Sequence, residues 1–329
     1  AAGPGLAGGF RLPCTPSTTP GTGRRASTAA TCTGTTRWCP TGTPRSPPAT
    51  PRAATAPRRT WRPASTRRSG PTAPATRASW RTTCTSCAPP PSVTFHIQPY
   101  KGRDDNTLHS NVKYILDKYG THKAFYRYKT STGRNLPLFY IYDSYLTPPE
   151  AWANLLSPSG SHSLRNTPYD AVFIALLVEE GHKQEILSAG YDGMYTYFAS
   201  NGFSYGSSHQ NWKAIKAFCD ANNLLFIPSV GPGYVDTSIR PWNNHNTRNR
   251  VNGKYYETAL QAALVVRPEI VSITSFNEWH EGTQIEKAVP MKTLTRLYLD
   301  YSPHQPDMYL ELTRRWAEQY SKEKEQWLM

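Results

Sequence analysis

Asp, Glu and Lys are absent from residues 1–92, which contain thirteen Arg and therefore carry a formal charge of +13. The whole chain has a formal charge of +14, so the remaining residues are almost neutral at +1. A strongly basic surface is the usual mark of a nucleic-acid-binding protein. The body of this chain, residues 93–329, does not have that composition, and we expect no nucleic-acid partner for it.

Residues 1–92 also lack Tyr, Ile, Asn, Gln, His and Met, and consist almost wholly of Ala, Pro, Thr, Arg, Ser and Gly. No helical or strand period runs through them, so little apolar surface is available to offset the entropy of the chain. We expect a disordered segment that ends at Ser92/Val93. An arginine-rich arm that folds on RNA is the alternative for this segment.

Other absences exclude several classes of site. No apolar run is long enough to span a bilayer, and no signal peptide is present. A glycine-rich phosphate loop is missing, which argues against nucleotide cofactors, and a serine hydrolase is a weaker alternative. Five of the six cysteines lie before Val93. Cys219 is the exception, and we expect it to be a buried apolar thiol.

The body alternates between apolar, β-branched runs and helix-like segments. Alternation of this kind predicts an α/β fold with a mostly parallel sheet covered by helices. The continuous apolarity of residues 170–178 is typical of a strand buried on both faces. Polar and aromatic side chains follow the strands, as at the catalytic face of a barrel enzyme. The predicted strands are residues 93–100, 136–143, 170–178, 192–199, 224–230 and 270–279.

The stretch SFNEWHEGTQIEK, residues 275–287, places Glu278 and Glu281 three residues apart directly after the last strand. In a helical or 3₁₀ turn the two side chains would point the same way. Neighbouring carboxyls cannot both ionise freely, so they can divide into acid and base, as glycoside cleavage requires. A solvated surface turn and a metal site that includes His280 are the alternatives; the metal site lacks further ligands at a set spacing.

Groups suited to a polyhydroxylated ligand are frequent in the body. Flat aromatic faces pack on sugar rings, while amide and guanidinium groups hydrogen-bond hydroxyls. Each such residue taken alone is more often a core or loop residue, but together they favour a sugar over an apolar ligand. They are Tyr195, Tyr197, Tyr205, Trp212, Tyr234, Arg240, Trp242, Asn243, Asn244 and Asn246.

Four strings resemble the glycoprotein endo-α-1,2-mannosidases, glycoside hydrolase family 99: FIALLVEEGHK, YTYFASNGFSYGSSHQNW, IPSVGPGYVDTSIRPWN and SITSFNEWHEGTQIEKAVP. The C-terminal RRWAEQYSKEKEQWLM is most similar to the vertebrate endo-mannosidase-like branch. The resemblance implies a (β/α)8 TIM-type barrel in the lumenal domain of a Golgi membrane protein. It also implies retaining, endo-acting cleavage of glucosylated high-mannose N-glycans without metal or cofactor.

The resemblance assigns roles to residues of the NEWHE motif. The first glutamate of the motif, Glu278, would assist the sugar 2-hydroxyl, and the second, Glu281, would be the general acid/base. Asn277 and Tyr197 match positions near the reacting sugar, and we place Tyr145 and His209 in the same pocket. Gln98 stands where a Glu is expected in related enzymes.

Residues 1–92 depart from the family, whose barrel begins with a strand similar to F-Y-Y-x-W-Y-G. A one-base shift of the reading frame turns Tyr, His and Asp codons into Thr and Trp codons into Gly. STTPGTG, TGT and PTGTP match such converted strings. We hypothesise that this segment is an out-of-frame translation, so that residues 93–329 supply only barrel strands three to eight. An unstable or inactive chain is then expected, with a silent glycan-binding remnant as the alternative.

Overall fold

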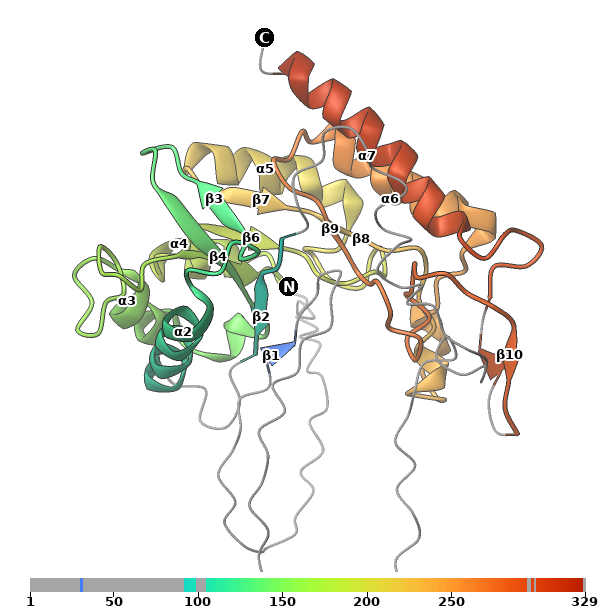
Figure 1. Cartoon of the computed structure of the whole chain (residues 1–329), viewed down its shortest axis with the longest axis horizontal. Coiled ribbons are helices and arrows are strands. Elements are labelled where there is room, and N and C mark those ends of the chain that lie inside the picture. Colours follow the sequence, from blue (N-terminus) through green and yellow to red (C-terminus); the bar gives the residue numbers. More distant parts are fainter. Residues whose placement is uncertain (1–29, 32–91, 99–104, 295–296, 299, 328–329) are drawn as a thin grey trace, which may run out of the picture.

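The computed structural model describes residues 30–31, 92–98, 105–294, 297–298 and 300–327 (Figure 1). The expectation of disorder and the reading-frame hypothesis therefore concern residues that lie, apart from 30, 31 and 92, outside the described part. The two-residue strand β1 (Ala30–Thr31) pairs antiparallel with β2.

The central sheet is parallel, and its strands follow one another in sequence order. Val, Ile and Phe recur in these runs, as is typical of strands buried on both faces. Its strands are β2 (Phe95–Ile97), β4 (Asn135–Ile141), β5 (Val172–Leu176), β6 (Gly193–Tyr195) and β7 (Leu225–Ile227). Directly after β7, β8 (Ser229–Val230) pairs in parallel with β9 (Ser272–Ile273). Each of the strands predicted from residue 93 onwards is thus present, although shorter than its apolar run.

Helices follow the strands, which confirms the predicted α/β alternation. Figure 1 shows α2, α3 and α4 beside the first strands and α6 packed along α7 at the other end of the sheet. The helices are α2 (Asp105–Tyr119), α3 (Pro149–Leu156), α4 (His182–Ser188), α5 (Trp212–Ala221), α6 (Lys254–Val265) and α7 (Met308–Trp327). Two short antiparallel pairings, β3 (Arg127–Lys129) with β4 and β10 (Met291–Lys292) with β11 (Leu297–Tyr298), were not predicted.

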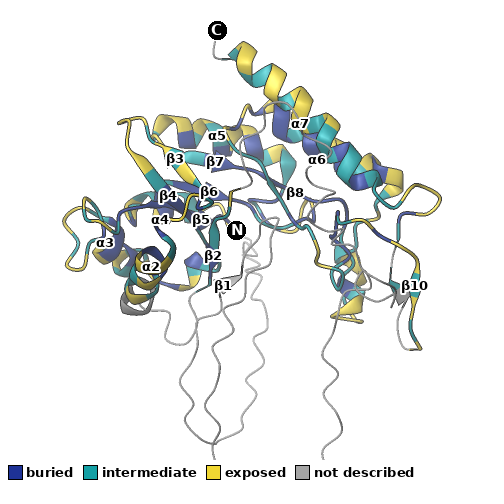
Figure 2. Ribbon diagram, viewed as in Figure 1, coloured by how far each residue is buried: buried dark blue, intermediate teal, exposed yellow. Residues whose placement is uncertain are grey.

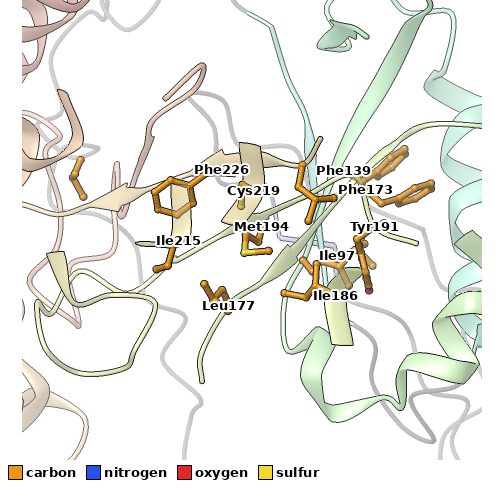
Figure 3. Close-up of a cluster of buried hydrophobic side chains, with 14 of the residues drawn as sticks. Ile97, Phe139, Phe173, Leu177, Ile186, Tyr191, Met194, Ile215, Cys219 and Phe226 are labelled. Carbon is orange, nitrogen blue, oxygen red and sulfur yellow. The ribbon is translucent and has the colours of Figure 1, made fainter. Parts of the chain in front are cut away.

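Alternate residues of the strands enter two separate apolar clusters, one on each face of the sheet. Leu138, Val172 and Ile174 belong to the smaller cluster, whereas Phe139 and Phe173 belong to the larger one with the helices. Phe139 and Phe173 stack at 5.7 Å between ring centroids, and Figure 3 shows both on the helix side near Ile97. Figure 2 shows buried strands below helices whose outer faces are exposed. Burial on both faces confirms the inference from residues 170–178.

The described sheet curves as part of a (β/α) barrel and does not close. Among the described residues, no strand pairing joins β9 to β2 or β1. A closed barrel of this class has eight parallel strands. The described parallel strands correspond to the predicted third to eighth strands, with β7 and β8 together forming one of them.

Helix α5 begins at Trp212, directly after the short 3₁₀ helix η3 (His209–Asn211). Upstream of η3, the Ser204 hydroxyl donates to the Ser207 hydroxyl at 3.1 Å. Cys219 is fully buried as predicted, and burial raises the pKa of its thiol to about 12. No described helix is both long and apolar enough to cross a membrane.

Candidate active site

Both candidate carboxylates lie at the C-terminal end of the parallel strands, on residues 275–283, here called the catalytic turn. The turn is closed at its base, where the Ser275 N–H donates to the Thr283 carbonyl at 2.9 Å. Gly282 ends a tight turn by donating its N–H to the Trp279 carbonyl at 3.3 Å, and its φ is +62°. The bond from Gly282 to Trp279 is a single i→i+3 bond, as in one isolated 3₁₀ turn or a β-turn, so the predicted turn does not continue into a helix.

The environment of Glu281 differs from that of Glu278. Glu278 is exposed, and its Oε1 accepts the His280 N–H at 3.0 Å. Glu281 is partly buried, and burial together with the charge of Glu278 raises the pKa of its carboxyl. The charge of Arg240 and a hydrogen bond with Tyr234 lower that pKa again, by less. A carboxyl with a raised pKa beside a second carboxylate is an arrangement suited to acid/base chemistry.

Aromatic side chains, among them Tyr197 and His96, lie at the C-terminal ends of the strands and are here called the aromatic floor of the site. Tyr197 follows β6 with a φ of +55°, and its N–H donates to the Ser229 hydroxyl at 2.6 Å. Burial, together with the charges of Glu281 and Glu278, raises the pKa of the Tyr197 hydroxyl. The ring of His96 stacks on Tyr197 at 5.5 Å, and burial lowers the pKa of His96 to about 4. His96 is therefore a neutral support for Tyr197 at neutral pH.

A third carboxylate, Asp143, lies at the end of β4. It accepts the Gln98 amide N–H at 2.7 Å and the Tyr145 hydroxyl at 3.2 Å. Its negative charge contributes to the raised pKa of Tyr142 and Tyr197. Asp143 thus connects the predicted site residue Tyr145 to the aromatic floor.

Residues 231–253, here called the β8–α6 loop, form hydrogen bonds with the catalytic turn. The Val235 N–H donates to the Glu281 carbonyl at 2.8 Å, and Arg250 Nη2 donates to the carbonyls of Gly282 and Gln284 at 2.8 and 2.7 Å. Inside the loop, the buried Asp236 accepts from the side chains of Tyr234, Arg240, Asn243 and Asn246. Sequence reasoning missed Asp236, although a single acid among several amide and guanidinium donors was a usable signal.

Comparison with known protein families identifies the family to which the chain belongs. Residues 89–322 match the family described as "Glycosyl hydrolase family 99". The chain belongs to this family.

Close relatives support the assignment. The chain is 83% identical over 237 residues to the human "Glycoprotein endo-alpha-1,2-mannosidase-like protein", which covers 72% of this chain and 52% of the relative. It is 70% identical over 232 residues to the mouse "Glycoprotein endo-alpha-1,2-mannosidase", covering 70% of this chain and 50% of the relative. This family 99 chain therefore spans about half the length of the curated relatives it matches.

A solved structure matches the fold. The GH99 endo-α-mannosidase from Bacteroides thetaiotaomicron superposes with a TM-score of 0.67 at 50% sequence identity. The match covers 70% of this chain and 66% of that one. At this identity the likeness extends beyond the fold to the family, in agreement with the sequence resemblance.

The remaining predicted residues of this family 99 chain are spread around the pair. Asn277 is exposed on the catalytic turn, next to Glu278. The Tyr145 ring stacks on His182 at 5.2 Å between ring centroids. The His209 ring contacts Trp212 at 4.4 Å, and its backbone N–H donates to Asn201. These contacts do not bring His209 to the carboxylates.

Several proposed sugar contacts have other roles. Trp212 and Tyr195 are buried in the apolar clusters, so their faces are covered. The amides of Asn243 and Asn246 bind Asp236, whereas Trp242 is 82% exposed on the same loop. Glu286 accepts the Trp279 indole N–H at 3.2 Å and so anchors the turn. The described residues contain no group of three or more His, Cys, Asp or Glu that could hold a metal ion.

Proposed function

We propose that this chain derives from a retaining, endo-acting α-1,2-mannosidase and that Glu278 and Glu281 are its catalytic residues. The observation that carries the proposal is the unequal pair: Glu281 is partly buried with a raised pKa, beside the exposed Glu278. The relatives are named as an endo-α-1,2-mannosidase and an endo-α-1,2-mannosidase-like protein, and these names support an α-1,2-mannoside as the substrate. The substrate would be a glucosylated high-mannose N-glycan.

The proposed mechanism assigns one proton transfer to each carboxyl. Glu278 takes the proton of the sugar 2-hydroxyl, whose oxygen attacks the anomeric carbon while Glu281 protonates the departing glycosidic oxygen. Glu281 then takes a proton from water, which opens the epoxide-like intermediate as Glu278 returns its proton to the 2-oxygen. Two inversions at the same carbon give net retention, and the raised pKa of Glu281 suits its first role as acid.

The other site residues are proposed as sugar contacts. Tyr197 lies beside the pair, and Asn277 is the exposed neighbour of Glu278. Tyr145 reaches the site through Asp143. His209, which lies on Trp212, would act only at the edge of the pocket. We further propose a Golgi lumenal location, which follows from the resemblance alone.

Turnover by this chain is proposed to be slow or absent. Among the described residues no pairing joins β9 to β1 or β2, and a sheet that does not close destabilises a barrel and loosens the loops at its rim. Purified chain should therefore release little or no glucosyl-mannose from a glucosylated high-mannose glycan, measured by mass spectrometry of the products. Rapid release that is lost in Glu281→Gln would contradict the proposed inactivity and support the catalytic assignment.

A glycan-binding protein without turnover is the second candidate, favoured by the same open sheet beside an intact carboxylate pair. Glycan binding that persists in a Glu278→Gln/Glu281→Gln double variant would support it. If glycan binding disappears in the double variant, the affinity for glycan depends on the two carboxylates Glu278 and Glu281. The nucleic-acid alternative concerns residues outside the described part of the chain.

A further inference from the structure

Asp236 is the most deeply buried carboxylate near the catalytic turn, with a side chain only 2% exposed. An unpaired charge at such depth would cost several kcal/mol. Here Arg240 Nη1 lies 2.7 Å from Oδ1, and Asn246 Nδ2 lies 3.4 Å from Oδ2. The Asn243 amide donates to the same Oδ2, and the Tyr234 hydroxyl to Oδ1 at 3.3 Å. One buried carboxylate thus gathers four side chains of the β8–α6 loop.

Two of those four side chains also act on Glu281. The Tyr234 hydroxyl and the charge of Arg240 both lower the pKa of the Glu281 carboxyl. The backbone between them is fixed as well, since the Val235 N–H donates to the Glu281 carbonyl at 2.8 Å. Asp236 therefore holds an arginine that lies close enough to affect Glu281 but is paired elsewhere.

We propose that Asp236 is a positioning residue: its carboxylate holds the β8–α6 loop against the catalytic turn and keeps the Arg240 guanidinium paired away from Glu281. Arg forms strong bidentate pairs with accessible carboxylates. Released from Asp236, Arg240 would move to Glu281 and hold it ionised, which removes the proton that a general acid must donate. This inference rests on the proposed acid role of Glu281.

The test is a titration of the Glu281 carboxyl that needs no turnover. The full chain is labelled with ¹³C at the glutamate side-chain carboxyl, and Glu281→Gln identifies the signal of interest. Asp236→Asn should lower the titration midpoint of Glu281 by about one pH unit or more, because Arg240 becomes its partner. Glu278, Tyr142, Tyr197 and Tyr234 are the other titratable groups facing Glu281, and the substitution leaves all of them in place.

A double-mutant cycle separates this effect from the loss of the Asp236 charge, which by itself also lowers the midpoint. In the Arg240→Ala background, Asp236→Asn should lower the midpoint far less than it does in the unaltered chain. Equal changes in the two backgrounds would overturn the proposal, because Asp236 would then act only through its own charge.

Asp170 provides the matched control. It is also a buried aspartate, paired with Arg134 at 2.8 Å and with Arg165 at 3.3 Å, but it lies just before β5, at the opposite end of the sheet. Asp170→Asn should lower the thermal midpoint of unfolding and leave the Glu281 titration unchanged. A shift of Glu281 in this variant as large as in Asp236→Asn would show a general loss of packing and contradict the proposal.

A second pair of variants keeps the test decisive if Asp236→Asn does not fold. Asn243→Ala and Asn246→Ala remove amide donors to Asp236 and keep every charge. Both should speed trypsin cleavage after Arg248 in the same loop, since Pro241 blocks cleavage after Arg240, and both should lower the Glu281 midpoint. No change in either measurement would contradict the proposal. If the Glu281 midpoint changes in these variants as expected but the chain neither cleaves nor binds a mannoside, the positioning role of Asp236 stands and only the proposed function is contradicted.

Discussion

Glu281 keeps its carboxyl partly buried beside the carboxylate of Glu278, and both features disfavour its ionised form. Its folded pKa therefore lies above the ordinary value of 4.5. As pH rises from 4.5 through the folded pKa, the folded state loses a proton that it holds more tightly than the unfolded chain does. Stability falls across that window and stays lower above it, so at neutral pH the ionised Glu281 destabilises the fold.

Replacing Glu281 by neutral glutamine should remove this cost. The Glu281→Gln chain should unfold at a higher temperature at pH 7, by a few degrees, since 1 kcal/mol corresponds to about 2–4 °C in a domain of this size. The difference should shrink below pH 4.5, where Glu281 is protonated in both states. Scanning calorimetry at pH 7 and pH 4 measures both effects. The exposed Glu325 in α7 is the control, and Glu325→Gln should change neither value.

Single residues also show how far sequence reasoning extends. The pair Glu278/Glu281 was predicted because the two acids stand three residues apart directly after a strand and match the family's NEWHE motif, and its catalytic role stays a prediction. Trp212 was misjudged as a sugar platform, because only packing decides whether an aromatic face is covered. Asp236 was missed for a related reason: its four partners are up to ten residues away, and their convergence depends on loop geometry.

At the scale of elements, the parallel strands tolerate little extra volume where they approach most closely. Gly193 begins β6 between β5 and β7, and its missing side chain leaves room for both neighbours. A Cβ at this position would lie 2.6 Å from the Leu225 carbonyl oxygen, 2.7 Å from the Leu225 Cβ and 3.0 Å from the Ile174 Cδ1. Two of these atoms belong to a paired strand and cannot move alone.

Gly193→Ala should therefore destabilise the chain by roughly 3 kcal/mol, at the upper end of typical overpacking costs. The matched control is Gly181→Ala at the start of α4, where a Cβ would meet nothing within 4 Å and φ is −60°. Urea unfolding followed by tryptophan fluorescence compares the two variants. Equal midpoints would contradict the tight approach of β5, β6 and β7.

Element types were predictable and element ends were not. Apolar runs located the strands because a strand buried on both faces needs nearly every side chain apolar. The start of α5 could not be read from the sequence, because the 3₁₀ helix η3 takes up residues 209–211 directly before it. The β3 pairing was not anticipated either, since Arg127–Lys129 carries no alternation of apolar and polar residues.

At the scale of the whole molecule, the described parallel strands form an arc whose outer edges, on β9 and β2, are not paired with each other. The catalytic turn follows β9, so the carboxylate pair lies at one end of this arc. Glu278 and Glu281 thus depend on the fold mainly through the β8–α6 loop and the base of the turn. A sheet that closes would support the same turn from both sides.

Supplying strands that close the described sheet should therefore raise activity without changing any residue of the site. Residues 1–92 are replaced by the segment that precedes the matched region in the mouse endo-α-1,2-mannosidase, joined at Val93. Pairing of the new strands with β2 and β9 should raise the unfolding temperature and yield glucosyl-mannose release at least tenfold above the unaltered chain. The same chimera with Glu281→Gln is the control, and it should keep the stability gain but lose turnover. A chimera that is stabilised yet silent would show that the fault lies in the site, because a closed sheet would then not suffice for the Glu278–Glu281 pair to work.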